Sequence, residues 1–338
     1  MPALRDRIPW IPLATLPTPV VACRVAGRDV LVKRDDLTAR PYAGNKVRKL
    51  EFLLAQAREA GARRVITAGA FGSHHALATT VFGQRVGLRV TCVLFPQPLT
   101  PHVRDVLRLI ASHGAELRFT RRMEGVPFAL RRARWRGRGE GAFVIPPGGS
   151  NPLGALGYVE AGLELGAQIA AGECPQPSCV HVAAGTLGTA AGMAVGLALA
   201  GLAIPVHGVR ITSPLVTNQR ALRALVRGTL ALLEPGAPVL PACADVVGTV
   251  MLRHDQVGEG YGRETAAANA AAAAFAAAGF ALDSTYTAKA AAALLADPPG
   301  VRPPLFWHTL SAYEPLPEGP VPDLSRLPEP FRSILHDC

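Results

Sequence analysis

Apolar and polar residues alternate between two patterns along the first half of the chain. Short apolar runs predict buried strands at residues 63–70, 88–95 and 115–120. The segments between them, 73–87 and 100–114, are typical of helices, and each ends at a glycine, where helices commonly stop. Alternation of this kind favours an α/β fold with a parallel sheet and right-handed crossovers.

The second half repeats the alternation after a Gly/Pro-rich passage at 143–158, which indicates a crossing between two domains. The segment 284–296 predicts a helix that begins with a Ser or Thr cap. The Pro-rich tail after Glu314 predicts irregular structure. The remaining expected elements are strands at 178–184, 204–211 and 304–310, and helices at 189–201 and 264–280.

The composition supports a compact α/β enzyme of two domains or one large one. The chain has 338 residues, of which 49% are hydrophobic and 18% charged. No uninterrupted apolar run is long enough for a membrane span, and the first residues lack the apolar core of a signal peptide, so we expect a cytoplasmic protein. The six cysteines are scattered and form neither a CxxC pair nor a metal-like spacing with histidine. We therefore expect reduced, mostly structural thiols and no metal site.

The formal net charge is +10, and part of it lies in the Arg-rich tract at 121–139. Such a tract could bind nucleic acid, but no recognisable binding module accompanies it. We therefore expect a solvated helix and loop and no nucleic-acid partner. Steering of an anionic small substrate remains an alternative.

Lysine is scarce: only Lys33, Lys46, Lys49 and Lys289 occur among 35 basic residues. Two of them lie three residues apart in "AGNKVRKLEF" at 43–52. A lysine can form a Schiff base, whereas the guanidinium of arginine stays protonated and cannot. Scarcity alone does not choose between Lys46 and Lys49.

A second candidate site is the loop in "VAAGTLGTAAG" at 182–192, between an apolar strand and a helix. Free backbone N–H groups at a helix start suit a phosphate, and two threonine hydroxyls lie nearby. The loop lacks both GxGxxG spacing and the Walker lysine, so a nucleotide is disfavoured. An anion loop together with a rare lysine indicates pyridoxal 5'-phosphate (PLP).

These motifs resemble a known family. The segments 32–76, 145–165, 258–262, 282–290 and 305–309 are similar, in order, to the 1-aminocyclopropane-1-carboxylate (ACC) deaminase and D-cysteine desulfhydrase family. The resemblance implies a two-domain fold-type II PLP enzyme, related to tryptophan synthase β, with parallel sheets flanked by helices. It also implies a large domain of 1–48 and 150–338, a small domain of 49–149, and a homodimer.

The resemblance assigns roles around the first lysine. Lys46 matches the Schiff-base lysine, which would also move the Cα or Cβ proton, and Asn45 beside it would help to hold the cofactor. Lys49 is then expected to be a structural helix residue. Ser73 matches a serine that contacts the substrate carboxylate or acts near the reacting carbon.

Further assignments complete the implied site. His75 matches the family histidine, whereas His74 replaces an asparagine expected to hydrogen-bond the cofactor's ring hydroxyl. Tyr261 and Tyr286 match two tyrosines on the substrate side, where either could donate or accept a proton. The implied phosphate cup consists of Gly185, Thr186, Leu187, Gly188 and Thr189. Leu187 stands where the family has a small residue, and phosphate binding is expected to survive provided that no positive φ is needed there.

Thr287 is expected to face the pyridine nitrogen, where the deaminases have glutamate. A hydroxyl favours a neutral ring and a shorter-lived carbanion, which suits β-elimination. The expected function is a PLP-dependent lyase that converts a small β-substituted amino acid, with D-cysteine the leading candidate, to pyruvate and ammonia. Leu310 and Ser311 replace family glycines, and with His74 and Leu187 they favour a changed substrate. The alternatives are ACC deaminase-like, racemase or β-replacement activity, or a non-catalytic PLP-binding homologue.

Overall fold

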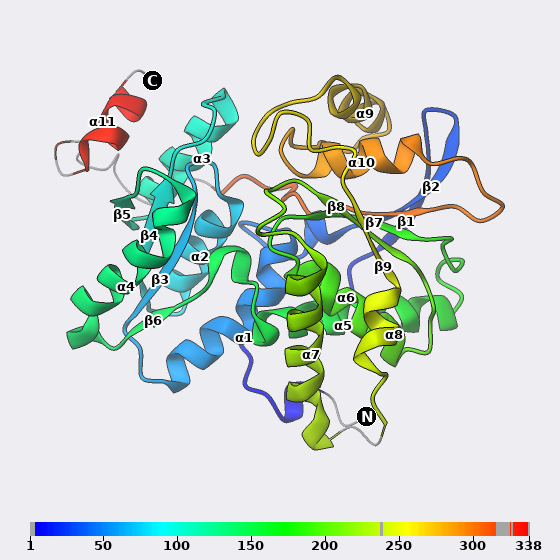
Figure 1. The fold of residues 1–338 in the computed structure, drawn as a ribbon, viewed down its shortest axis with the longest axis horizontal. Helices are drawn as coiled ribbons and strands as arrows, with labels where there is room; N and C mark the ends of the chain where they lie inside the picture. Colours follow the sequence, from blue (N-terminus) through cyan, green and yellow to red (C-terminus); the bar gives the residue numbers. More distant parts are fainter. Residues whose placement is uncertain (1–3, 237–238, 316–324, 326, 337–338) are drawn as a thin grey trace.

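The computed structural model describes residues 4–236, 239–315, 325 and 327–336, and it contains two separate sheets (Figure 1). The large sheet has six strands in the order β1-β2-β10-β7-β8-β9, and the small sheet has four in the order β5-β4-β3-β6. All paired strands are parallel except β1 and β2, which form an antiparallel hairpin. The expected α/β class is thus confirmed, with a mixed rather than purely parallel large sheet.

The strands of the large sheet come from both ends of the chain, whereas those of the small sheet are contiguous. The large sheet consists of β1 (Val20–Val25), β2 (Arg28–Lys33), β7 (Val180–Ala184), β8 (Val206–Arg210), β9 (Val250–Arg253) and β10 (Leu305–Trp307). The small sheet consists of β3 (Arg64–Ala70), β4 (Arg89–Phe95), β5 (Glu116–Phe119) and β6 (Ala142–Val144). The domain boundaries at residues 48–49 and 149–150 stay predictions.

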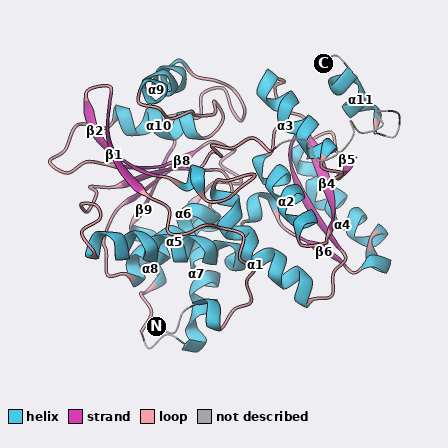
Figure 2. Ribbon diagram, turned by 180° about the vertical axis from the view of Figure 1, so that it is seen from behind, coloured by secondary structure: helices cyan, strands magenta, loops and turns pink. Residues whose placement is uncertain are grey.

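Helices cover both faces of each sheet, as α/β architecture requires. On the large sheet, α5 to α8 pack on one face and α9 and α10 on the other (Figure 2). On the small sheet, α1, α2, α3 and α11 pack on one face and α4 on the other. Their bounds are α1 (Asn45–Glu59), α2 (His74–Arg85), α3 (Pro101–Ser112), α4 (Val126–Arg136), α5 (Pro152–Ala170), α6 (Gly188–Leu199), α7 (Gln219–Leu233), α8 (Cys243–Gly248), α9 (Ala266–Ala277), α10 (Thr287–Ala296) and α11 (Glu329–His336).

Two details differ from the sequence-based expectations. Helix α10 has no Ser or Thr cap, because the carboxylate of Asp283 accepts the N–H groups of Thr285, Tyr286 and Thr287 instead. The tail contains α11, whose Phe331 is buried in the core of the small sheet. Among the described residues, no helix has both the length and the apolar character needed to cross a bilayer.

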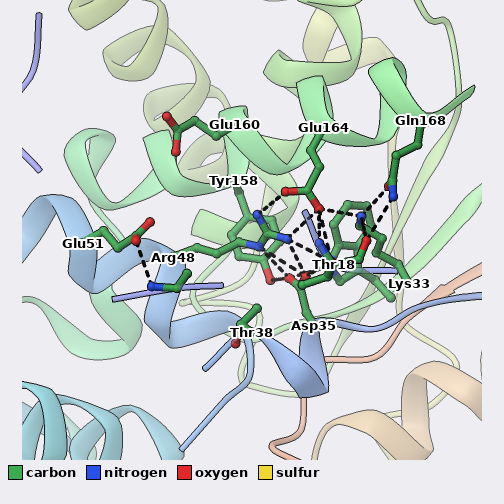
Figure 3. A network of polar contacts seen from close by, with 12 residues as sticks. Thr18, Lys33, Asp35, Thr38, Arg48, Glu51, Tyr158, Glu160, Glu164 and Gln168 are labelled. Atoms are coloured by element: carbon green, nitrogen blue, oxygen red, sulfur yellow. Dashed lines mark hydrogen bonds and ion pairs between the residues drawn. The ribbon is translucent and has the colours of Figure 1, made fainter. Parts of the chain in front are cut away.

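A buried polar network holds α1 against the large sheet (Figure 3). The Arg48 guanidinium on α1 donates to the carboxylate of Asp35, at 2.8 Å, and to both oxygens of Glu164 on α5, at 3.0 Å. Tyr158 and Trp307 donate to the other oxygen of Asp35 at 2.6 and 2.7 Å. Because every member is partnered, the network fixes the orientation of α1 without leaving a buried charge uncompensated.

Candidate active site

A cavity of about 1050 Å³ lies between the two sheets and is lined by residues of both. It is bordered by the loops that follow the carboxyl ends of β3, β7 and β8, where ligands bind in open α/β sheets. Apart from Thr287, every predicted site residue lines it: Asn45, Lys46, Ser73, His74, His75, Gly185, Thr186, Leu187, Gly188, Thr189, Tyr261 and Tyr286.

Lys46 lies in the first turn of α1, two residues after Gly44, a glycine whose conformation the site requires. Gly44 has φ +94°, and a Cβ atom there would lie 2.5 Å from the carbonyl oxygen of Thr309. Ser311, one of the residues that depart from the family pattern, accepts the N–H of Ala43 at 2.8 Å. The loop after β10 therefore sets the direction in which α1 starts and Lys46 enters the cavity.

Lys49, expected to be structural, also enters the cavity, one helical turn after Lys46. Its ammonium is buried beside the Gly/Thr loop and donates to the carbonyl of Gly148, at 3.2 Å, and to the hydroxyl of Ser150, at 3.3 Å. Both partners are neutral, and burial, followed by the nearby Lys46 charge, lowers the pKa of Lys49 well below its ordinary value. An anion beside this ammonium would supply the missing counter-charge.

The space around this ammonium fits the phosphate of PLP. A Cβ atom at Gly188 would lie 2.6 Å from the Ser150 hydroxyl and 3.0 Å from Lys49 Nζ, so only a glycine leaves this cradle open. The cradle lies at the N-terminus of the twelve-residue α6, whose dipole and free N–H groups favour an anion. Asn45 Nδ2 donates to the Thr189 hydroxyl at 3.2 Å and so connects the starts of α1 and α6.

Leu187 adopts a positive φ. Its assignment to the phosphate cup had assumed that no positive φ is needed at this position. Its φ and ψ are +66° and −15°, and it precedes the first residue of α6. Its side chain is only 2% exposed and packs in the core of the large sheet. A left-handed conformation costs a non-glycine residue about 1–2 kcal/mol, whereas burial of a leucine contributes about 2–5 kcal/mol. The buried side chain therefore outweighs the backbone strain.

This balance predicts that Leu187→Ala destabilises the protein more than Leu187→Gly does, the reverse of the order usual for a buried leucine. Leu187→Ala loses the packing and keeps the strain, so it should reduce the free energy of unfolding by about 2–5 kcal/mol. Leu187→Gly should be less damaging by about 1 kcal/mol, because glycine adopts positive φ without strain. At Leu165, buried within α5, glycine should instead be worse than alanine. Urea denaturation of the four variants tests this, and the same order at both positions would contradict it.

The start of α2 carries Ser73 and His74. The buried Ser73 hydroxyl caps α2 by accepting the N–H of Ala76 at 3.2 Å. Both ring nitrogens of His74 are already engaged, one by the Tyr42 hydroxyl at 2.5 Å and the other by His102 at 3.2 Å. Burial lowers the pKa of His74 to about 4, and the Asp283 carboxylate opposes part of that shift. His74 is thus neutral near pH 7, and a new hydrogen bond would have to displace one of its partners.

His75, the next residue of α2, is anchored to the small sheet. Its Nε2 lies 2.9 Å from the Thr67 hydroxyl of β3, and the side chain is 3% exposed. Burial lowers the pKa of His75 well below its ordinary value, with the Lys46 and Lys49 charges adding to the effect. The ring is therefore a neutral part of the cavity wall.

Tyr261 and Tyr286 meet in the cavity, as the resemblance implied for the substrate side. Their hydroxyl groups share a hydrogen bond, and their rings meet edge to face. Burial raises the pKa of Tyr261 to about 12 and that of Tyr286 well above its ordinary value. Both phenols are therefore protonated at neutral pH and available as proton donors.

Thr287 is hydrogen-bonded to Asp283, a residue that the sequence interpretation missed. The Thr287 hydroxyl accepts the Asp283 N–H at 2.8 Å and donates to the Asp283 carboxylate at 2.7 Å. Asp283 lines the cavity, and its charge opposes the effect of burial on the pKa of Lys46. An aspartate just before a helix is a common capping signal and could have identified it. That Thr287 faces the pyridine nitrogen stays a prediction.

Comparisons with known proteins identify the fold and the family. A family described as pyridoxal-phosphate dependent enzyme matches residues 11–309. Nocardicin C-9' epimerase of Nocardia uniformis subsp. tsuyamanensis is 40% identical, over 91% of this chain and 94% of its own. D-Cysteine desulfhydrase of Klebsiella pneumoniae (strain 342) is 35% identical, over 91% and 97%.

A solved structure agrees with these relatives. The crystal structure of an ACC deaminase homologue is 30% identical, covers 91% of this chain and 93% of its own, and has a TM-score of 0.74. The family match spans most of the chain, and the cavity offers a lysine and an anion cradle that fit the cofactor. The chain therefore belongs to the pyridoxal-phosphate dependent enzyme family and is a PLP-dependent enzyme of fold type II.

Proposed function

We propose that the protein removes the α-proton of a small β-substituted amino acid and eliminates the β-substituent, with release of pyruvate and ammonia. PLP bound at Lys46 supplies an electron sink for the bond that breaks at Cα. The observation that carries this proposal is the placement of Lys46 in one cavity with the paired phenols of Tyr261 and Tyr286. A base and a proton donor are the two groups that α,β-elimination requires.

The Lys46 amine has the acidity expected of a base that works near neutral pH. Burial lowers the pKa of Lys46 to about 8, against an ordinary value of 10.5. The neutral amine fraction therefore increases about tenfold per pH unit below pH 8 and levels off above it. We expect the rate of PLP attachment to the cofactor-free protein to follow this curve, measured by stopped-flow absorbance. A rate that keeps increasing to pH 10 would contradict the assignment.

The phenol pair is proposed to protonate the leaving group. Tyr286→Phe should slow pyruvate formation by on the order of 10²-fold or more, since general-acid catalysis contributes at least that much. Exchange of the substrate α-proton with D₂O, which needs Lys46 alone, should fall far less. Proton NMR and a pyruvate assay on the same sample measure both. Tyr42→Phe is the matched control, because it too removes one phenol hydroxyl, in this case one that is bonded to His74 of the cavity. Equal losses of exchange and elimination in Tyr286→Phe would count against this role.

Epimerisation is the second candidate, and one contact favours it. The Thr287 hydroxyl already gives its proton to Asp283 and accepts the Asp283 N–H, so only a lone pair remains. A cofactor nitrogen facing this lone pair would have to carry the proton itself, which strengthens the electron sink and prolongs the life of the deprotonated substrate. Return of a proton at Cα would then compete with loss of the β-substituent. The relative that is 40% identical is named as an epimerase.

A screen of amino-acid enantiomers separates the candidates. The PLP-loaded protein is incubated in D₂O with D- and L-cysteine, with other β-substituted amino acids and with amino acids that lack a leaving group. Pyruvate and ammonia from one enantiomer support the lyase, whereas deuterium at Cα with inversion and no pyruvate supports the epimerase. Neither product nor exchange with any of them would support a non-catalytic PLP binder. For the intact enzyme we expect a homodimer, as the resemblance implies, and a location in the cytoplasm.

A further inference from the structure

A second group of chemically reactive side chains lies at the opposite end of the large sheet. Cys179 precedes β7, His181 lies on β7 and His207 lies on β8, whereas Asp297 directly follows α10. One donor atom from each of these residues lies within 4.8 Å of the other three. Among the described residues, these are the His, Cys and carboxylate side chains that lie close enough together to bind a metal ion.

The strand register explains why these side chains meet. His181 and His207 are directly paired across the parallel strands β7 and β8, so both side chains point to the face that α10 covers. Asp297 is the C-cap of α10, and its carboxylate contacts a nitrogen of each ring, although it lies 116 residues from His181 in the chain. The site therefore combines three elements that only the packed sheet brings together.

The distances match a tetrahedral zinc site. His181 Nε2, His207 Nδ1 and Asp297 Oδ2 form a triangle with sides of 3.0, 3.1 and 3.3 Å. In a regular tetrahedron with metal–ligand distances of about 2.0–2.1 Å, the ligands lie about 3.3–3.4 Å apart. An ion placed just above this triangle would contact all three atoms with only small movements of the side chains. The sulfur of Cys179 lies 3.7 Å from the other nitrogen of His181, and the donor atoms of the four residues lie within 4.8 Å of one another. A rotation of the Cys179 side chain would therefore bring the sulfur to the ion as a fourth ligand.

The carboxylate is already oriented for such a role. Asp297 Oδ1 accepts a hydrogen bond from Arg253 of β9 at 2.5 Å, while Oδ2 faces the two imidazoles. A hydrogen bond to the non-ligating oxygen is the usual way in which proteins hold a metal-binding carboxylate in place. His181 is fully buried, and the His207 and Asp297 side chains are 13% and 23% exposed, which leaves a path for an ion to enter.

We propose that Cys179, His181, His207 and Asp297 bind a zinc ion. Thiolate and imidazole ligands suit zinc and disfavour magnesium and calcium, which take oxygen ligands. The site begins about 13 Å from the Gly185 end of β7, because Gly185 is four residue steps along the strand from His181. Four protein ligands also leave no open position for a substrate. The ion is thus structural: it ties the end of α10 to the sheet, and the start of α10 presents Tyr286 to the cavity.

Zinc titration of the chelator-treated PLP-bound protein tests the proposal. Calorimetry should detect one equivalent of zinc per chain, and saturating zinc should raise the melting temperature. Cobalt(II) added in place of zinc should give the visible bands of tetrahedral cobalt and a thiolate-to-cobalt band in the near ultraviolet. Both measurements use the wild-type protein, so they do not require that a variant folds. Wild-type protein without stoichiometric zinc binding and without these bands would overturn the proposal.

Variants then locate the ion. His207→Ala and Asp297→Ala should weaken zinc binding by more than the roughly 10- to 100-fold expected for Arg253→Ala, which removes only the orienting hydrogen bond. Cys179→Ser should lose the thiolate band. The matched controls are His254→Gln, which alters an exposed histidine, and Cys243→Ser, which alters another free cysteine. Zinc binding that is equally strong in the cluster variants and in the controls would place the ion elsewhere and refute the assignment.

Discussion

Replacing Lys46 by alanine is expected to abolish the visible absorbance band of the PLP-loaded protein and to slow α-proton exchange by on the order of 10³-fold or more. Two functions are lost together, the amine that holds the cofactor covalently and the base that moves the α-proton, and a general base alone contributes about 10²–10⁴-fold. Arginine cannot replace it, because the guanidinium stays protonated. Absorbance spectra and exchange of the α-proton in D₂O measure the two losses.

Lys49→Met is the comparison that distinguishes the two lysines. Its ammonium lies at the anion cradle of Ser150 and Gly188, so the variant should bind PLP more weakly but still form the visible band at high PLP concentration. Methionine keeps the apolar length of the side chain in this buried position. If Lys46→Ala retained the band and Lys49→Met lost it at every PLP concentration, the two assignments would have to be exchanged.

Replacing Arg48 by methionine is expected to lower the free energy of unfolding by about 3–5 kcal/mol, the usual cost of leaving a buried charge without its partner. Asp35 is fully buried, and burial by itself raises its pKa. The charge and hydrogen bonds of Arg48, together with Lys33 and Trp307, outweigh that effect, so the pKa of Asp35 is lowered. Without Arg48, both Asp35 and Glu164 lose their main cationic partner. Urea denaturation of the cofactor-free protein measures the change.

A matched control and a double variant make this result specific. Arg108 pairs with Asp105 on the surface of α3, so Arg108→Met should cost no more than about 0.5 kcal/mol. Adding Asp35→Asn to Arg48→Met removes one uncompensated charge, so the combined loss should be smaller than the sum of the two single losses. Additive losses, or equal effects at Arg48 and Arg108, would show that the buried network does not stabilise α1 as described.

The departures from the family pattern have different structural consequences. Ser311 makes a hydrogen bond to Ala43 that a glycine could not make, so the loop after β10 remains ordered around Lys46. Leu187 is accommodated at positive φ by its buried side chain. His74 is held between Tyr42 and His102. These two contacts occupy both ring nitrogens of His74, which could otherwise have reached the cofactor. Of these changes, His74 alters the hydrogen bonds available in the cavity most directly.

Local patterns in the sequence were sufficient to predict the strands and helices around the site. The apolar run at 63–70 became β3 (Arg64–Ala70), and the Gly/Thr loop lies between β7 and α6 as expected. These predictions succeed because strand and helix periods, and the glycines that end helices, act over a few neighbouring residues. The same local patterns assigned the cap of α10 to a Ser or Thr, because Ser, Thr and Asp are all common cap residues and local spacing does not show that Asp283 takes this role.

The sequence by itself thus determined the α/β class, the cofactor and the two lysines that could matter, since each depends on residue type and local spacing. Only the tertiary structure showed that Lys49 lies at the anion cradle, that Asp283 binds Thr287 and lines the cavity, and that Cys179 and Asp297 lie in one cluster with two histidines. These contacts join residues that are in some cases more than a hundred positions apart. They depend on strand order and helix packing, which the local spacing of apolar and polar residues does not reveal.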